Sequence, residues 1–316
     1  MKTVQSETKK RKNSKFIFAS IEQRQLTVLA LPAVILAFVF QYLPIGGIIM
    51  AFKEFNANLG IFKSPWNGFE NFKFFFQSQD AFRVVRNTVL FGIDFQIVGI
   101  VFALALALFL YEIRSKLALK TIQTVMILPH FISYVLVAFI TYAILNLNYG
   151  VLNKLIVFFG GEKIDWYSDY KYWPYILTVV DIWKKVGMNC IIYYAALMGI
   201  DECLFEAARL DGATKWQEIR YIKIPELSSV VCILFILGIG HLISGDFGLF
   251  YQVPMDIGVL YPVTDIINTY VFRGLQQATN LGMTSAVGLF QSVVSLILVV
   301  GTNLIVKKID PEQSLF

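Results

Sequence analysis

The sequence predicts an all-α polytopic membrane protein with six transmembrane helices and a short cytoplasmic helix between the fourth and the fifth. Three observations lead to this fold class. Of the 316 residues, 57% are hydrophobic and 16% are charged, whereas a soluble domain is about half apolar and a quarter charged. The apolar residues form blocks of the ~20 residues that cross a bilayer. A polar, helix-forming segment, residues 206–225, separates two of these blocks.

Six apolar blocks define the predicted spans. They cover residues 26–52, 88–111, 121–145, 174–200, 228–250 and 283–306. The first block is longer than a signal-peptide core and has no evident small-residue cleavage site, so we expect it to be retained as a span. The prediction is therefore one transmembrane domain, residues 26–306, between an amino-terminal segment, 1–25, and a tail, 307–316.

The distribution of basic residues predicts that both termini are cytoplasmic. This orientation places 16 Lys and Arg residues in cytoplasmic loops and 9 in the opposite loops, as the positive-inside rule requires. The basic run at residues 9–15 could in principle bind nucleic acid, but a positive segment before a span is typical of a topogenic anchor. We expect no nucleic-acid partner, and we expect residues 201–227 to face the cytoplasm.

The loops on the opposite side are rich in aromatic residues, at positions 64–76 and 165–175. Such residues form belts at membrane–water interfaces, and they also form docking or sugar-stacking surfaces. For the loop before span four we favour the belt. The first loop is too long to be all belt and is expected to pack as short interfacial helices.

The sequence contains no pattern typical of an enzyme. Its three cysteines, at 190, 203 and 232, lie in or beside spans four and five, so no disulfide framework is expected. Its two histidines, His130 and His241, are far apart and do not suggest a metal site. A phosphate-binding loop, a nucleophile elbow and a dinucleotide fingerprint are all missing from the sequence. We therefore expect no catalytic residue, metal or bound cofactor in this chain.

Residues 206–225 are predicted to form a helix–turn–helix. Ala207 and Ala208 favour a first helix, and Gly212 tolerates the positive φ of a turn. A second helix is expected over 213–223, with Pro225 ending it before the next span. Its small residues permit the close approach of another surface, to which the neighbouring charged groups can bind; these are Glu206, Arg209 and Asp211. On these grounds alone, the segment could dock to a partner or lie in the interface as an amphipathic linker.

The stretch "EAARLDGATKWQEIRYIKIP" resembles the signature loop of the integral membrane subunits of binding-protein-dependent ABC importers. The family pattern is Glu-Ala-Ala, two residues, Asp-Gly-Ala, then Trp-Gln and a terminal Ile-x-Leu-Pro. The matching positions are Glu206, Ala207, Ala208, Asp211, Gly212, Ala213, Trp216, Gln217, Ile222 and Pro225. Ile219 replaces a common phenylalanine and Ile224 a common leucine, and both remain apolar. The resemblance implies that this loop is a coupling helix that docks in a groove of a cytoplasmic ATPase subunit.

The resemblance covers nearly the whole chain. Segments similar to the sugar-permease branch are "LPAVILAFVFQYLPI", "NGFENF", "VMILPHFIS" and "DIWKKVGMNCIIYYAAL"; "SGDFGLFYQ" and "GMTSAVGLFQSVVSLILVV" are similar to polysaccharide or complex-carbohydrate permeases. What this implies is a subunit of the bacterial cytoplasmic membrane that works by alternating access with a second homologous permease. Two ATPase subunits that use ATP and Mg, and an extracytoplasmic solute-binding protein, would complete the importer. The implied cargo is a carbohydrate, an oligosaccharide; the alternative is a peptide, polyamine or phosphate ester.

Ionisable residues inside the bilayer are costly and usually face a cavity or a partner. In span four, Asp181 is three residues before Lys184 and four before Lys185, so one lysine can pair with it on the same helix face. The other lysine needs a different partner: Asp94, a helix carboxyl end, a second permease or substrate. Structural pairing is our expectation, and substrate contact is the alternative.

Span five has several glycines among polar residues, which indicates a broken helix lining a cavity. Such a wall would suit a hydroxyl-rich solute, because polar groups exchange hydrogen bonds with sugar while aromatic rings cover its apolar faces. The alternative for each residue is hydrogen bonding between helices. The candidate residues of the translocation path are Asn87, Asp181, Lys184, Lys185, Asn189, Tyr193, Tyr194, Asp246 and Phe247.

Overall fold

A computed structural model describes residues 21–276 and 281–311, in two compact units, Met1–Ile49 and Met50–Phe316. The predicted basic run at residues 9–15 and positions 312–316 of the predicted tail lie outside the described residues. The elements of the first unit begin with α1 (Ile21–Ala37) and the π-helical turn η1 (Phe38–Tyr42), after which the 3₁₀ helix η2 (Leu43–Phe52) starts. Together they give one apolar helical run, Gln25–Phe52, at the predicted position of span one.

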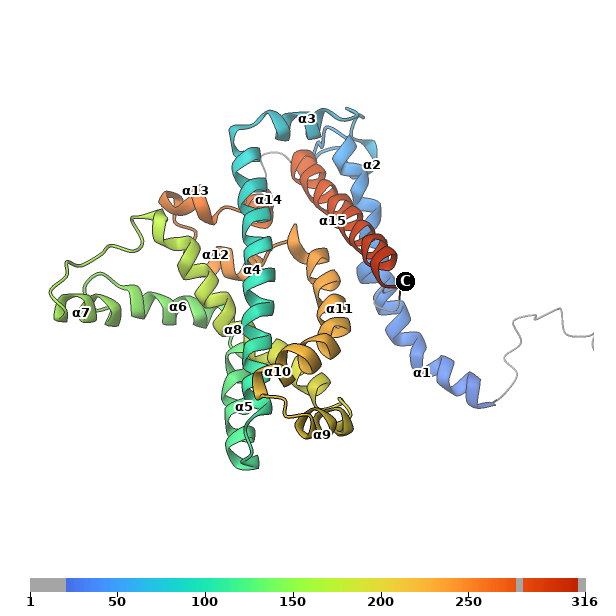
Figure 1. The fold of residues 1–316 in the computed structure, drawn as a ribbon. Helices are drawn as coiled ribbons and strands as arrows, with labels where there is room; N and C mark the ends of the chain where they lie inside the picture. Colours follow the sequence, from blue (N-terminus) through green and yellow to red (C-terminus); the bar gives the residue numbers. More distant parts are fainter. Residues whose placement is uncertain (1–20, 277–280, 312–316) are drawn as a thin grey trace, which may run out of the picture. The chain divides into compact units, whose positions relative to one another are not determined.

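All regular elements described in the second unit are helices (Figure 1), and an isolated antiparallel bridge joins Lys53 to Trp66. In chain order they are α2 (Gly60–Lys63), α3 (Glu70–Gln77), α4 (Gln79–Tyr111), α5 (Lys116–Phe131), α6 (Tyr134–Leu145), α7 (Val151–Phe158), η3 (Tyr170–Tyr172), α8 (Trp173–Leu197), α9 (Glu202–Leu210), α10 (Lys215–Glu218), η4 (Ile219–Lys223), α11 (Ile224–Leu242), α12 (Phe247–Gln252), η5 (Gly258–Leu260), α13 (Tyr261–Thr264), α14 (Ile267–Gln276) and α15 (Leu281–Ile309).

The described residues contain four helical runs long and apolar enough to cross a membrane, and up to six if each bent helix pair is one span. The four runs are Gln25–Phe52, Asp80–Tyr111, Lys215–Leu242 and Leu281–Lys308. The bent pairs are Lys116–Phe131 with Tyr134–Leu145, at 101°, and Tyr170–Leu197 with Glu202–Leu210, at 71°. A multi-pass, all-helical membrane protein is confirmed.

Residues 121–145, predicted as one span, lie in two helices, because α5 and α6 meet at a sharp bend. Pro129 lies in the last turn of α5, where its ring disturbs the helical hydrogen-bond ladder. Ser133 then starts α6 afresh by accepting a hydrogen bond from the backbone N–H of Leu136, at 3.4 Å. The break leaves carbonyl groups at the end of α5 without helical partners.

The predicted break in span five is confirmed. α11 ends at Leu242, and Gly245 has a φ of +62° before α12 begins at Phe247. The Asp246 carboxylate caps α12 by accepting from the backbone N–H of Leu249 at 3.3 Å. The break therefore places an aspartate at the start of the new helix.

α4 is the central helix of the second unit and packs against α8 and α11 (Figure 1). Hydrophobic clusters surround it, and one of them includes Phe91, Leu177 and Leu249 from α4, α8 and α12. α8 also lies very close to α5: a Cβ on Gly187 would be 1.9 Å from the Met126 carbonyl oxygen. Only glycine permits this approach.

In the stretch before α8, for which an aromatic belt was predicted, Trp166 and Trp173 are buried and the Trp173 indole donates to the Trp166 carbonyl oxygen at 2.7 Å. Tyr170 and Tyr175 are exposed, so the belt remains a prediction for these two residues only. In the first loop, α2 and α3 are short helices, as expected, and Trp66 and Phe69 are exposed.

Candidate functional site

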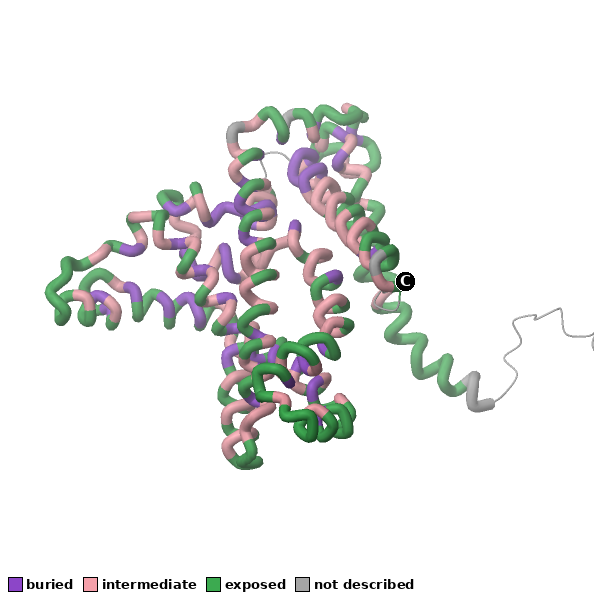
Figure 2. Tube along the Cα trace, in the orientation of Figure 1, coloured by how far each residue is buried: buried purple, intermediate pink, exposed green. Residues whose placement is uncertain are grey.

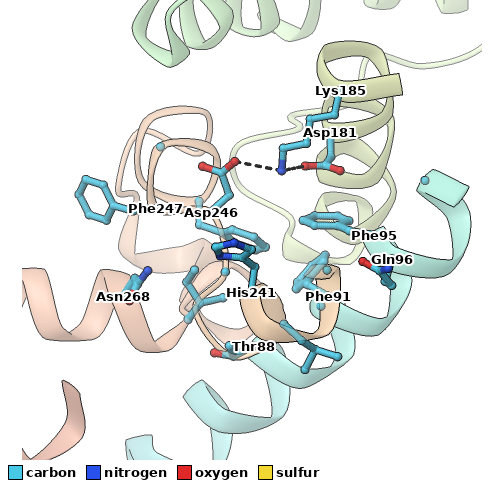
Figure 3. Close-up of a pocket in the computed structure, with 18 of the residues that line it drawn as sticks. Thr88, Phe91, Phe95, Gln96, Asp181, Lys185, His241, Asp246, Phe247 and Asn268 are labelled. Carbon is cyan, nitrogen blue, oxygen red and sulfur yellow. Dashed lines mark ion pairs between the residues drawn. The ribbon is translucent and has the colours of Figure 1, made fainter. Parts of the chain in front are cut away.

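A cavity of about 590 Å³ lies between α4, α8 and the break that separates α11 from α12 (Figure 3). The α4 residues that line it lie in the middle of that helix, as do those of α8. Aromatic rings, amides and charged groups share its surface. The lining residues used below are Thr88, Phe91, Phe95, Gln96, Asp181, Lys185, Asn189, His241, Asp246, Phe247 and Asn268.

Lys185 bridges two carboxylates in this cavity. Its ammonium lies 2.5 Å from Asp181 on the same helix and 3.0 Å from Asp246 at the start of α12 (Figure 3). Asp181 is almost fully buried, and a buried carboxylate needs such a partner. The ion pair predicted within span four is therefore present, and a third charged group joins it.

Lys184 turns away from the cavity and binds the end of α5. Its ammonium donates to the carbonyl oxygens of Pro129, at 3.3 Å, His130, at 3.0 Å, and Ile132. The Pro129 carbonyl also accepts from the Ile132 N–H at 3.2 Å, and Lys184 supplies a donor to the carbonyls at the end of a helix, where the helical ladder stops. A helix carboxyl end was one of the partners expected for the second lysine.

Tyr134, the first residue of α6, connects the two broken helices. Its hydroxyl donates to the Asp246 carboxylate, and the Lys184 ammonium lies 4.7 Å from its ring centre. A cation over an aromatic face is a favourable arrangement. Side chains of α8 and α6 therefore hold the α5–α6 bend next to the α11–α12 break.

The structure brings five of the nine predicted path residues to the cavity: Asp181, Lys185, Asn189, Asp246 and Phe247. The other four lie elsewhere. Asn87 donates to the carbonyl oxygens of Pro262 and Asp265, and Lys184 binds α5. Tyr193 is buried in a hydrophobic cluster against which Tyr194 packs.

Sequence reasoning missed the part of the cavity that α4 lines. These α4 residues recur at helical spacing, so they lie on one face of the helix. They are Thr88, Phe91, Gly92, Phe95, Gln96 and Gly99. This spacing of polar, aromatic and glycine residues was a usable signal. His241, Asn268 and Tyr134 come from other elements and were not selected either.

The predicted cytoplasmic-loop segment, residues 201–227, forms two short helices joined by a turn. Asp201 caps α9 by accepting from the backbone N–H of Cys203 at 3.0 Å. Gly212 has a φ of +78°, as predicted for the turn. Thr214 and Gln217 then form a reciprocal capping box at the start of α10.

One surface of this segment is exposed (Figure 2). Leu210 and Trp216 are large apolar residues with exposed fractions of 89% and 67%. The other exposed residues of the predicted signature are Glu206, Ala207, Asp211, Gly212, Gln217 and Pro225, while Ala208, Ala213 and Ile222 are half-buried. Arg209 was expected to offer its charge to a partner; instead its guanidinium donates to buried Glu218 at 3.0 Å.

Pro225 does not end the helix, contrary to the prediction. The π-helical turn η4 continues α10 into α11, and Lys215–Leu242 is one helical run. Pro225 lies in the first turn of α11. A proline is tolerated in the first turn of a helix. The π-helical turn before it changes the local hydrogen-bond pattern, so the helix continues although Pro225 has no N–H to donate.

The segment is attached to the carboxyl end of α4 through Glu112. This carboxylate accepts hydrogen bonds from Lys215 and from Lys223, the latter at 2.6 Å. Lys223 is almost fully buried, with its ammonium 4.5 Å from the Tyr111 ring centre. The hydrogen bonds from Lys215 and then Lys223 lower the pKa of the Glu112 carboxyl, so it stays ionised at neutral pH.

Comparison with known proteins places this geometry in a family. The family described as "Binding-protein-dependent transport system inner membrane component" matches residues 97–312, which include the cytoplasmic-loop segment and the cavity residues of α8, the α11–α12 break and α14, but not the α4 lining residues from Thr88 to Gln96. The chain belongs to this family. It is therefore an inner-membrane transport subunit, a permease, and not an enzyme.

Curated relatives match almost the whole permease. It is 37% identical over 288 residues to protein LplB of Bacillus subtilis, covering 91% of this chain and 90% of the relative. It is 36% identical over 306 residues to the polygalacturonan/rhamnogalacturonan transport system permease protein YteP of the same organism, covering 96% and 94%. These relatives support its place in the sugar-permease branch.

Two solved structures have the same fold as the permease. One is a bacterial ABC transporter involved in the import of the acidic polysaccharide alginate, with a TM-score of 0.84 and 31% identity over 92% of this chain and 97% of that chain. The other is the alginate transporter in complex with an alginate pentasaccharide-bound periplasmic protein, with a TM-score of 0.84 and 30% identity, covering 93% and 98%.

Proposed function

We propose that this permease and a second homologous permease form the translocation path of an ATP-driven importer for an oligosaccharide. The observation that carries the proposal is the cavity at the α11–α12 break. Amides and carboxylates there can exchange hydrogen bonds with sugar hydroxyls, and phenylalanine rings can cover the apolar faces of sugar rings. Sugar transport by the named relatives agrees with this cargo.

The proposed path in this subunit consists of Asp181, Lys185, Asn189, Asp246 and Phe247, together with the α4 face described above. Irregular backbone at membrane depth is tolerated where it lines a cavity. In this proposal the chain has six spans with both termini in the cytoplasm, where the bent pair α5–α6 counts as the third span and α8 as the fourth.

The proposed coupling surface is the exposed face of α9, the Gly212 turn and α10. Its residues are Glu206, Ala207, Ala208, Asp211, Gly212, Ala213, Trp216 and Pro225. An apolar pair as exposed as Leu210 and Trp216 is typical of a surface that a partner covers. That partner would be a cytoplasmic ATPase, two copies of which use ATP and Mg, while an extracytoplasmic protein delivers the solute.

Uptake by cells that produce the complete importer tests this function. We expect accumulation of labelled oligosaccharides, such as mannotetraose or methyl-esterified tetragalacturonate, to need both this chain and ATP. Deleting the gene for this chain alone should abolish it. Accumulation of a peptide, polyamine or phosphate ester in place of every saccharide would contradict the proposal.

A further inference from the structure

The cavity of this permease carries a net negative charge. The Lys or Arg among its described lining residues is Lys185, and the carboxylates are Asp181 and Asp246. Two carboxylates and one ammonium leave one negative charge among these three groups. Lys185 is also shared between the two carboxylates, at 2.5 and 3.0 Å, so its charge is already neutralised before any cargo arrives.

The neighbouring lysine does not add a positive charge to this wall. Lys184 has its ammonium bound to the end of α5 and lies over the Tyr134 ring. Freeing it would leave three carbonyl oxygens of the α5–α6 bend without that donor, which is costly in a buried place. On the wall that this subunit provides, an anionic cargo would therefore meet carboxylates without an available cation.

An uncharged sugar can make favourable contacts with the residues that line the same cavity. Phe91, Phe95 and Phe247 offer apolar surface, and the amides of Gln96 and Asn189 offer both donors and acceptors. The Asp246 carboxylate interacts with Lys185, Tyr134 and the backbone N–H of Leu249, and a carboxylate has about four acceptor positions. A sugar hydroxyl can donate to the position left over, whereas another carboxylate cannot.

We infer that the cavity selects uncharged saccharides, and that the Asp181–Lys185–Asp246 cluster rejects saccharides bearing carboxylates. Like charges repel strongly at short range in a medium of low dielectric constant, and an anion also loses its hydration there. The inference rests on the proposed carbohydrate function. It gives this permease a cargo unlike that of the alginate importer, whose polysaccharide is acidic.

Binding of matched neutral and acidic probes tests the inference. The protein is the full importer complex, purified without the solute-binding protein. The selectivity of the solute-binding protein then does not contribute to the measured binding. The first pair is β-1,4-linked mannotetraose and tetramannuronate; the second is tetragalacturonate with its carboxyls methyl-esterified or free. Saturation-transfer difference NMR detects weak binding of each. We expect a neutral probe to bind at least tenfold more tightly than its acidic partner.

Asp246→Asn removes one negative charge and keeps a side chain that caps α12, since Asn is a good N-cap. It should reduce the discrimination against the acidic probe at least threefold. Asp201→Asn is the matched control: Asp201 also caps a helix, accepting from the backbone N–H of Cys203 at 3.0 Å, and does not line the cavity, so discrimination should be unchanged. If Asp246→Asn does not fold, the wild-type comparison still decides.

Equal or tighter binding of the acidic probes by the wild-type complex would overturn the inference and leave the proposed function standing. Failure of all four probes to bind would overturn it too. The uptake experiment above then shows separately whether the carbohydrate function also fails.

Discussion

Lys184 and Lys185 are neighbours in sequence but have different structural roles. Successive residues of an α-helix point about 100° apart around its axis, so the two ammonium groups reach different surroundings. Lys184 binds backbone carbonyls at the end of α5, and Lys185 binds the carboxylates of Asp181 and Asp246. Each lysine can therefore be removed with a different consequence.

Replacing Lys185 by Met should destabilise the permease by about 3–5 kcal/mol, because it leaves the buried Asp181 carboxylate without a cation. Adding Asp181→Asn should recover much of that loss. Lys184→Met should cost about 1.5–3 kcal/mol for a lost charged hydrogen bond, and Asp181→Asn should not rescue it. Thermal unfolding of the purified complex is the measurement, and equal rescue of both variants would contradict these assignments.

The sequence was sufficient to predict the pair between Asp181 and a lysine, because that contact depends only on helical spacing. It could not identify Asp246 or Tyr134 as further partners, since they come from other helices. Tyr193 and Tyr194 show the converse. Their polar groups made them candidates, yet packing placed them in a hydrophobic cluster, and residue type alone does not decide between these outcomes.

Gly212→Val should weaken coupling while leaving membrane insertion intact. Its φ of +78° is unfavourable for a β-branched residue, at a cost of about 1–3 kcal/mol in local structure. Gly212→Asn is the matched control, because Asn tolerates this conformation. We expect Val to reduce uptake and co-purification of the ATPase and Asn to retain most of both. Wild-type behaviour of the Val variant would show that the turn is not needed.

Among elements, the contact between α5 and α8 depends on the missing side chain of Gly187. Gly187→Ala would place a Cβ 1.9 Å from the Met126 carbonyl oxygen, so the helices must move apart. Overpacking of this kind costs about 1–3 kcal/mol. We expect a lower thermal midpoint for this variant. Gly288→Ala on α15, where nothing lies within 4 Å, is the control and should be neutral or stabilising; an equally stable Gly187→Ala would contradict the close approach.

At this scale the sequence predicted the break in α11–α12 but not the bend between α5 and α6. Glycines and polar residues marked the first directly. Pro129 alone does not distinguish a kinked helix from the 101° bend that is present. The bend also depends on Lys184, which binds carbonyl groups at the end of α5 from another helix, and this contact is not visible in the local sequence. The prediction that Pro225 ends the helix was wrong for a related reason, because the residue pattern does not reveal the π-helical turn η4 before it.

In the whole molecule, α4 connects the cavity with the cytoplasmic-loop segment. One face of the middle of α4, between Thr88 and Gly99, lines the cavity, and Glu112 follows the last residue of α4. Glu112 then binds Lys215, the first residue of α10, and Lys223, the last residue of η4. Any displacement of the segment by a partner protein would therefore act on the helix that lines the proposed path.

Glu112→Gln should uncouple ATP hydrolysis from uptake. The change leaves the buried Lys223 ammonium without its anion and weakens the attachment of the segment to α4. We expect the number of saccharide molecules imported per ATP to fall at least fivefold, with hydrolysis persisting. Glu226→Gln, an exposed residue in the first turn of α11, is the control and should change the ratio little. An unchanged ratio in Glu112→Gln, or an equal fall in both variants, would rule out this connection.

The pH dependence of coupling gives a second test of Glu112. Its pKa is lowered in the folded protein, so its contribution is fully present above the unfolded pKa and is lost as the pH falls through the folded value. Wild-type uptake per ATP should therefore not change between about pH 6 and 8 on account of this group. The Gln variant cannot ionise and should show the reduced ratio throughout that range. A wild-type ratio that fell to the level of the variant by pH 6 would mean that Glu112 is not held ionised by Lys215 and Lys223.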